Sequence, residues 1–444
     1  MFGTAGVRGV FNKSQGLDQV YKLVQTGAFV LGKGRYALGW DGRKSSFVLG
    51  RAAVSGALAA GSDVFVLGLV ATPVVAFGTV RNRCLAGFSV TASHNPPEFS
   101  GVKIFDATGM ELDESTEMNI ERALVVDSWK SARNVGSVIR GENIVEEYID
   151  TLVSRFSPTK RRLKIVLDCA NGPGGNVTPW VLSRLGHKVI PVNSQISWRF
   201  TARNPEPTAE NLRDTCSLVR ESGSDIGLAH DGDADRLVVI NSSGQVVSDA
   251  IIPMIFLRRF NRTGAVVLSE NTSSAVTEEA ERLGFDVVRG RVGKTFVGLK
   301  ENDAVLASEP SKVVDPSWGM WEDGIHAAAF ICDAASRDAS ILGLISNGVV
   351  WLYKQVNLPV GVDVRRLSIR VDDVFAKFKI QEKREMFGLK MLFRDGSWIM
   401  FRPSGTEPKT RIYCESRDSL RLDELLQEGV KCVQTCSHVL NEAR

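Results

Sequence analysis

The clearest chemical signal in the sequence is an acidic run, DGDADR, at residues 231–236. Three carboxylates at alternate positions of a tight, glycine-containing loop can converge on one hard cation, and oxygen ligands favour Mg²⁺ or Ca²⁺. The run is not an EF-hand, because residue 242 is Ser instead of the required Glu. The alternative is an acidic surface turn, which three aspartates directly after an apolar strand disfavour. Asp231, Asp233 and Asp235 are therefore the predicted metal ligands, and Arg236 is expected to reach a phosphate or carboxylate nearby.

A second polar segment, TASHNPP at residues 91–97, also follows an apolar strand. Ser93 can act as a nucleophile with His94 as its base, but the G-x-S-x-G elbow of hydrolases is absent, and adjacent side chains point apart on an extended chain. A serine that carries phosphate fits better, because the phosphate would supply the metal's missing ligand. On spacing alone, an Asn-Pro turn with a capping serine is still the favoured interpretation.

A third segment, RPSGTEPKTR at residues 402–411, has the composition of a phosphate-binding loop. It offers two hydroxyls, a glycine that permits close backbone approach and an arginine at each end. It lacks the order of a Walker loop. A structural turn is the alternative, and the two arginines favour anion binding. The glycine-rich opening, FGTAGVRG at residues 2–9, is similar and less specific.

The elements that must position these loops alternate in type along the chain. Short Val- and Ile-rich runs at 163–169, 225–229 and 265–268 predict buried strands, and 210–221 and 274–283 predict amphipathic helices. This alternation is typical of α/β domains.

A weak internal repeat is present in which a helix ends at a glycine and a strand follows, at Gly61, Gly186 and Gly284. Downstream of each glycine a second strand runs into a polar loop, at 86–95, 225–235 and 303–312. Any α/β protein repeats strand, loop and helix, so the pattern alone leaves the question open. If the repeat is real, three similar units present equivalent loops at strand ends, where α/β proteins bind ligands.

The tail differs in pattern from the rest. Charged and apolar residues mix after a predicted linker near 351–360, strand-like sequence surrounds a turn at Asp395-Gly396, and 419–440 predicts a closing helix. A smaller α+β domain is expected here.

Composition limits the class of protein. The 444 residues require several domains, and 54 basic against 51 acidic residues are interleaved without a basic face, which argues against nucleic-acid binding. Seven scattered cysteines without a C-x-x-C pair favour a reduced, cytoplasmic protein, and the absence of a long apolar run argues against a membrane span. Neither monomer nor homodimer is favoured by the sequence.

Taken together and in this order, FGTAGVRG, TASHNP, DGDADR and RPSGTEP resemble the α-D-phosphohexomutase superfamily, and the resemblance extends from residue 2 to about 415. It implies a cytoplasmic enzyme with three related mixed α/β domains and a smaller C-terminal α+β domain around a central cleft. The implied boundaries are 1–142 for a phosphoserine domain, 143–245 for a metal-binding domain, 246–352 for a sugar-binding domain and 353–444 for a phosphate-binding domain.

The resemblance also implies roles for individual residues. Ser93 is the implied phosphoserine, whose phosphate completes the shell of one Mg²⁺ held by the three aspartates. Arg8 and Thr4 belong to the first active-site loop, His94 and Lys103 match positions of proton transfer, and Arg236 matches the arginine beside the metal. The residues implied to bind substrate are Glu309 and Ser311 in the sugar loop and Arg402, Ser404, Gly405, Thr406 and Arg411 in the phosphate loop.

The sugar loop departs from the bacterial pattern G-E-x-S-G-H, because it reads SEPSKV and places Lys312 and Val313 at the last two positions. Together with WEDG at 321–324 it looks more like archaeal members. The expected reaction converts a hexose 6-phosphate to its 1-phosphate through a bisphosphorylated sugar, with glucosamine as the first candidate and a glucose or glucosamine 1,6-bisphosphate as primer. The alternatives are a phosphomannomutase/phosphoglucomutase, a non-catalytic sugar-phosphate-binding homologue and a metal-dependent phosphatase.

Overall fold

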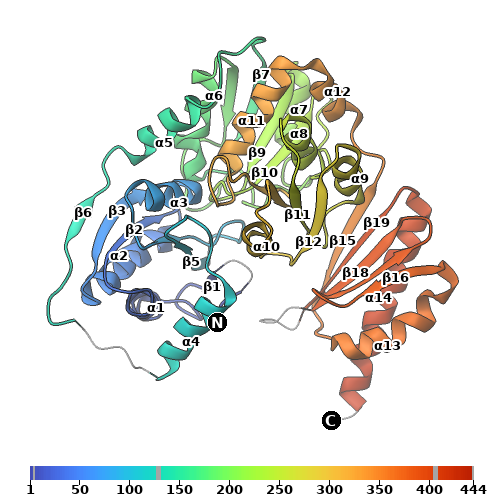
Figure 1. The fold of residues 1–444 in the computed structure, drawn as a ribbon, viewed down its shortest axis with the longest axis horizontal. Coiled ribbons are helices and arrows are strands. Elements are labelled where there is room, and N and C mark those ends of the chain that lie inside the picture. Colours follow the sequence, from blue (N-terminus) through green and yellow to red (C-terminus); the bar gives the residue numbers. More distant parts are fainter. Residues whose placement is uncertain (4–5, 127–131, 404–408, 443–444) are drawn as a thin grey trace.

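The computed structural model describes residues 1–3, 6–126, 132–403 and 409–442. Four β-sheets follow one another along the chain, each with its own helices, and give the four-domain architecture seen in Figure 1. The first three sheets mix parallel and antiparallel strands, whereas all pairs in the fourth are antiparallel. The predicted fold class is confirmed.

The first domain contains a six-stranded sheet with the order β1-β5-β4-β2-β3-β6. Its strands are β1 (Val7–Val10), β2 (Arg35–Trp40), β3 (Asp63–Leu69), β4 (Ala86–Val90), β5 (Phe99–Asp106) and β6 (Val138–Arg140). Its helices are α1 (Leu17–Leu31), α2 (Lys44–Ala59), α3 (Thr72–Arg81) and α4 (Glu114–Val126).

The second and third domains each contain a four-stranded sheet, with the orders β10-β9-β7-β8 and β12-β11-β13-β14. The second has α5 (Ile144–Val153), β7 (Lys164–Asp168), the 3₁₀-helix η1 (Pro173–Asn176), α6 (Thr178–Arg184), β8 (Lys188–Val192), α7 (Arg213–Glu221), β9 (Ile226–His230) and β10 (Leu237–Asn241). The third has α8 (Ile251–Arg259), β11 (Ala265–Ser269), α9 (Ser274–Arg282), β12 (Asp286–Gly290), α10 (Thr295–Glu301), β13 (Leu306–Glu309), β14 (Lys312–Val314), α11 (Gly324–Arg337) and α12 (Ala339–Asn347).

The three sheets share one topology, which confirms the internal repeat. In each, a central strand (β4, β9 or β13) pairs in parallel with one neighbour and antiparallel with the strand that follows it in sequence. The parallel neighbour pairs in turn with a further parallel strand. The loops after β4, β9 and β13 therefore occupy equivalent positions, and they contain Ser93, the aspartate run and Ser311.

The helix-ending glycines of the repeat adopt a conformation that suits glycine. The φ angles of Gly61, Gly186 and Gly284 are +77°, +94° and +81°. A left-handed residue directly after a helix satisfies its last carbonyls and turns the chain, and only glycine enters that region without steric cost. Each glycine thus ends a helix and starts the next strand, as predicted.

Apolar cores join the first three domains. One core combines side chains from one face of the second sheet and one face of the third, including Leu167, Ile255 and Leu268, and another joins α3 and α5 to α6 and α11. The fourth domain has a core of its own, and a small cluster of Val292, Trp398 and neighbours connects it to the third. The first three domains are therefore one continuous packed unit, to which the fourth is attached through a smaller contact.

The fourth domain corrects one prediction. The expected linker near 351–360 is instead an edge strand, β15 (Leu352–Leu358), which pairs with β19 (Thr410–Ser416). The hairpin at Asp395-Gly396 lies between β17 (Leu389–Phe393) and β18 (Trp398–Pro403), and the remaining elements are α13 (Val364–Phe375), η2 (Ala376–Phe378), β16 (Ile380–Arg384) and α14 (Ser419–Glu442). None of the described helices combines the length and apolar character needed to cross a membrane.

Candidate active site

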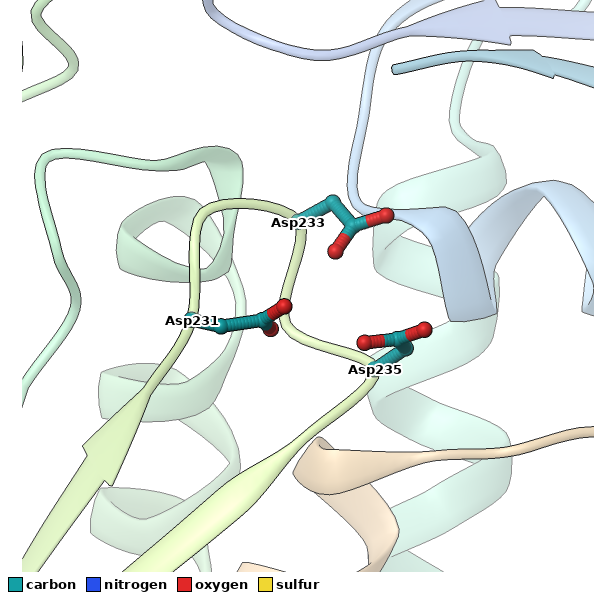
Figure 2. Close-up of side chains that lie close together, drawn as sticks. All are labelled: Asp231, Asp233 and Asp235. Carbon is teal, nitrogen blue, oxygen red and sulfur yellow. The ribbon is translucent and has the colours of Figure 1, made fainter. Parts of the chain in front are cut away.

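The three aspartates lie on the turn between β9 and β10. All residues of these two strands are buried. Strands covered on both faces consist of continuous apolar residues, so the polar run after β9 stands out at the strand's carboxyl end. All three carboxylates are buried, and one oxygen of each lies within 4.8 Å of the others. Figure 2 shows the side chains of Asp231, Asp233 and Asp235 converging from this turn.

In Asp233 and Asp235, donors from the described part of the chain reach one carboxylate oxygen, Oδ2, and not the other, Oδ1. Asp233 Oδ2 accepts from Thr72 Oγ1 at 2.7 Å and lies 3.2 Å from Thr91 Oγ1. Asp235 Oδ2 accepts from Lys103 Nζ at 2.5 Å and Lys312 Nζ at 3.0 Å. The Oδ1 atoms of both aspartates are buried and have no hydrogen-bond partner among the described residues.

This division fits a divalent cation. A buried carboxylate oxygen without a donor is costly, and a metal ion removes that cost by binding it. Two unpartnered oxygens, a third carboxylate beside them and an all-oxygen donor set match the requirements of Mg²⁺. Asp231, Asp233 and Asp235 would hold the ion, while their outer oxygens are fixed by protein donors.

The predicted nucleophile lies at this cluster. Ser93 Oγ donates a hydrogen bond to Asp231 Oδ2 at 2.7 Å, and the serine is fully buried. Its φ is +50°, a left-handed conformation that is uncommon for a residue other than glycine and is held by the surrounding loop. The structure thus brings the first and second polar loops together between two domains.

The geometry of the neighbouring His94 corrects the sequence-based argument that the side chains of residues 93 and 94 point apart. Because Ser93 is left-handed and not extended, its side chain and that of His94 lie on the same side, with Oγ and Nδ1 3.3 Å apart. Burial lowers the pKa of His94 well below its usual range, and the Arg236 and Arg8 guanidinium groups lower it further. The imidazole is therefore neutral and able to accept a proton.

Lys103 approaches from β5 and is also buried. Burial by itself would lower the pKa of this lysine, but the carboxylates of Asp233 and Asp235 raise it above its usual range. The ammonium lies 2.5 Å from Asp235 and 3.2 Å from Asp233. In this arrangement Lys103 is a charged donor to the aspartates.

Two arginines flank Ser93. Arg8, on β1, donates to Asn95 Oδ1 at 2.9 Å, and Arg236 donates to Glu206 Oε1 at 3.0 Å and lies 3.9 Å from Asp231. The Nε atom of each guanidinium is buried and has no hydrogen-bond partner in the part of the chain that the structure describes. Both can therefore still donate to the oxygens of an anion at Ser93.

The sugar loop contains the two predicted sugar ligands, Glu309 and Ser311. Glu309 accepts hydrogen bonds from the Gly293 backbone N–H and from Thr295 Oγ1 at 3.1 Å, and Ser311 Oγ donates to Asp249 at 2.9 Å. Both predicted sugar ligands are therefore engaged with protein groups. Lys312 instead extends from this loop to the aspartate cluster.

In the C-terminal domain, Arg402 and Arg411 are direct cross-strand neighbours on β18 and β19. Like charges placed opposite one another destabilise a sheet unless an anion lies between them. Arg402 donates to the Val292 carbonyl of the third domain at 3.1 Å. The predicted loop residues Thr4, Ser404, Gly405 and Thr406 lie outside the described residues.

Sequence reasoning missed Asp41 and Arg43, which follow β2. The Arg43 side chain has no exposed surface, and it donates to the carbonyls of Ser93 at 2.7 Å, Asn95 at 2.6 Å and Pro96 at 2.5 Å. Its Nε is 3.0 Å from Asp41 Oδ2. The signal was the position of D-G-R directly after a buried strand, the same position as the other polar loops.

Comparison with known sequences agrees with this arrangement. Profiles described as "Phosphoglucomutase/phosphomannomutase, alpha/beta/alpha domain" I, II and III match residues 1–129, 146–244 and 248–347, and that of the C-terminal domain matches 367–431. A phosphopentomutase of Thermococcus kodakarensis is 33% identical over 100% of this chain and 99% of its own. A probable phosphoglucosamine mutase of Methanobrevibacter smithii is 32% identical over 98% of both chains.

Solved structures share the fold. A phosphoglucomutase/phosphomannomutase family protein of Burkholderia thailandensis superimposes with a TM-score of 0.85 at 24% identity, covering 98% of this chain and 97% of its own. A putative phosphomannomutase of Thermus thermophilus gives 0.82 at 25% identity, covering 98% and 99%. An N-acetylphosphoglucosamine mutase of Aspergillus fumigatus, solved with GlcNAc-6P and magnesium, gives 0.61 at 14% identity, covering 98% and 96%.

Fold, site and relatives define the class as an isomerase that works by intramolecular phosphoryl transfer. Its substrates are sugar phosphates, and magnesium and phosphoserine are typical of such enzymes. The chain belongs to the phosphoglucomutase/phosphomannomutase family, within the α-D-phosphohexomutase superfamily.

Proposed function

We propose that this chain interconverts a hexose 6-phosphate and the corresponding 1-phosphate, with Ser93 as the phosphorylated nucleophile. The observation that supports this most strongly is the 2.7 Å contact between Ser93 Oγ and Asp231, next to two buried carboxylate oxygens to which no described residue donates. A phosphate on Ser93 would meet a cation held by these oxygens. Thr4 and the other loop residues outside the described part of the chain keep their proposed substrate roles.

Charge stabilisation is the main task of the site. Mg²⁺, when bound, supplies positive charge at the transferring phosphoryl group. Arg8 and Arg236 donate their free Nε–H groups to its equatorial oxygens, where negative charge is spread during transfer. Both guanidinium groups are held in place by partners, Asn95 and Glu206, so they do not have to reorganise during the reaction.

The chemistry is a pair of reversible transfers. In the first, the bond from phosphorus to Ser93 Oγ breaks, a bond to the sugar hydroxyl oxygen forms, and the hydroxyl proton ends on Ser93. In the second, Ser93 Oγ attacks the other phosphate of the bisphosphorylated sugar, and the proton returns to the sugar oxygen. His94 is neutral and its Nδ1 is 3.3 Å from Ser93 Oγ, so it relays the proton. Lys103, as a charged donor, fixes Asp235.

Between the two transfers the bisphosphorylated sugar must turn around without leaving. Arg402 and Arg411 provide a second anion site, which holds whichever phosphate is not reacting. The small apolar contact between the third and fourth domains is consistent with movement of this site during turnover. A glucose or glucosamine 1,6-bisphosphate is the proposed primer that first phosphorylates Ser93. A monomer or homodimer would suffice, because the residues named come from one chain.

Glucosamine 6-phosphate is the proposed substrate, because several relatives about one third identical over nearly the whole chain are probable phosphoglucosamine mutases. A pentose phosphate is the second candidate, favoured by the likeness to a phosphopentomutase. A phosphomannomutase/phosphoglucomutase activity and a binding-only homologue are the remaining alternatives.

The test is a side-by-side assay of glucosamine, glucose, mannose and pentose phosphates with Mg²⁺ and a sugar bisphosphate. We expect isomerisation of glucosamine 6-phosphate without net phosphate release, and one phosphate on the peptide that contains Ser93. Ser93→Ala should abolish both. Isomerisation that persists in Ser93→Ala would refute the proposed nucleophile, and net release of phosphate would indicate a phosphatase.

A further inference from the structure

Lys312 has no function in the mechanism above, although its side chain reaches the metal ligands. It is the first residue of β14 and pairs directly with Glu309 across a two-residue turn. Ser311, in this turn, has a φ of +65°, and the turn is tight enough to bring the lysine back beside the strand end. The loop thereby connects the third domain to the aspartate cluster of the second.

The ammonium group is buried between two carboxylates. Lys312 Nζ lies 3.0 Å from Asp235 Oδ2 and forms an ion pair with Glu322. The lysine side chain is 10% exposed, and those of Asp235 and Glu322 are 1% and 14% exposed. Screening by water and salt is weak at such a position, so its charge acts strongly on its surroundings.

Positive charge already lies against the aspartates before any metal binds. Lys103, Lys312 and Arg236 contact the three carboxylates, and Lys312 and Arg236 also pair with Glu322 and Glu206. A site whose carboxylates are already neutralised by fixed cations attracts a divalent ion less strongly, because affinity for such ions follows the charge of the ligand set.

Lys312 is not needed to hold Asp235 in place. Lys103 Nζ donates to the same Oδ2 atom at 2.5 Å, and none of the described residues donates to Asp235 Oδ1. Loss of Lys312 therefore leaves the aspartate oriented by Lys103. What the site loses is one positive charge, and Glu322 loses the ammonium group that neutralises it.

We propose that Lys312 lowers the affinity of the aspartate trio for its divalent cation, so that the ion is retained chiefly while Ser93 carries phosphate. This inference rests on the proposed function, because it needs the metal site and the phosphoserine. A phosphate adds about 1.5 to 2 negative charges at neutral pH and restores the attraction that Lys312 removes. The metal then stays where a phosphoryl group is ready to be transferred.

The test measures metal binding without turnover. Mn²⁺ is titrated into the full-length protein with unphosphorylated Ser93, verified by intact mass, and the free ion is followed by electron paramagnetic resonance. Lys312→Met should bind Mn²⁺ about tenfold more tightly than the wild type. Glu322→Gln, which leaves the Lys312 charge uncompensated, should weaken binding by a comparable factor. Lys312→Arg should bind like the wild type.

Lys164→Met is the matched control, because it removes a half-buried ammonium group from the opposite end of the second sheet. Lys164 starts β7, which runs parallel to β9, whereas the aspartates follow the end of β9. The Mn²⁺ affinity of the Lys164→Met variant should equal that of the wild type. Unchanged or weaker binding by Lys312→Met, or a change of the same direction in Lys312→Met and Glu322→Gln, would overturn the inference.

A separate assay of the wild type keeps the two proposals apart. If the wild type isomerises sugar phosphates and Lys312→Met does not bind metal more tightly, only the inference about Lys312 fails. If the variants shift Mn²⁺ affinity in opposite directions as expected and the wild type does not isomerise any sugar phosphate, the proposed function fails and the effect of Lys312 on the metal site holds.

Discussion

Replacement of Arg43 by Met should cost both stability and turnover. The guanidinium group has no exposed surface, hydrogen-bonds the carbonyls of Ser93, Asn95 and Pro96, and pairs with Asp41 at 3.0 Å. Breaking a buried ion pair by removing one partner typically costs about 3–5 kcal/mol, because the other charge stays buried without compensation. We expect a loss of that size in the free energy of unfolding, measured by urea denaturation.

The effect on catalysis follows from the position of Ser93. Its left-handed backbone is held by Arg43 and by a hydrogen bond from its own N–H to Thr91 Oγ1 at 2.8 Å. A displacement of the nucleophile by about 1 Å can reduce turnover about 100-fold. The variant should therefore show a kcat lowered by roughly that factor, with a smaller change in KM, when assayed with the substrate that the wild type isomerises.

Two further variants separate the structural from the catalytic effect. Asp41→Asn combined with Arg43→Met removes the uncompensated charge, so it should recover part of the stability but none of the lost kcat. Arg51→Met, in helix α2 that follows Arg43, removes an exposed arginine that stacks on Phe47 and should change the stability by less than about 1 kcal/mol. A stable Arg43→Met protein with wild-type kcat would show that the loop does not depend on Arg43.

Three other variants follow from the same reasoning. Burial and the nearby Arg289 lower the pKa of Lys390 to about 7, so the unfolded chain binds a proton that the folded chain loses above that pH. The free energy of unfolding should therefore rise between pH 7 and 9, by at most about 1.4 kcal/mol per pH unit, and Lys390→Met should flatten this rise in denaturant titrations. Asp233→Asn removes one charged metal ligand and should weaken Mg²⁺ binding, measured by calorimetry, at least about tenfold; equal affinity would exclude Asp233 as a ligand. Arg402→Met should raise the KM for the sugar phosphate more than it lowers kcat, because it leaves Arg411 without its partner at the second anion site; a change in kcat alone would place Arg402 elsewhere in the mechanism.

Local signals made much of the fold and of the site predictable. The aspartate run and TASHNPP each follow an apolar strand, so sequence alone indicated polar loops at the carboxyl ends of buried strands. Glycines 61, 186 and 284 end helices in left-handed conformations, and this recurring signal revealed three equivalent units. The meeting of Ser93 with Asp231 follows from that equivalence, although the residues are 138 positions apart.

The features of the fold and site that the sequence did not predict depend on contacts between distant segments. β15 looked like a linker because it is an edge strand without a buried residue, and its partner β19 lies more than fifty residues further along. The hydrogen bond from the Gly293 N–H to the Glu309 carboxylate likewise joins segments that the sequence does not show to be neighbours. The position of Arg43 after a buried strand was a signal, but its contacts with the Ser93 loop depend on how the chain folds back.

The claim on which everything else depends is that Ser93 and the three aspartates gather around one divalent cation. An anomalous difference map of crystals grown with Mn²⁺ and a sugar bisphosphate tests it most directly. We predict a single strong peak bound by Asp231, Asp233, Asp235 and an oxygen on Ser93. A peak bound by other residues, or a Ser93 loop turned away from the ion, would contradict the account.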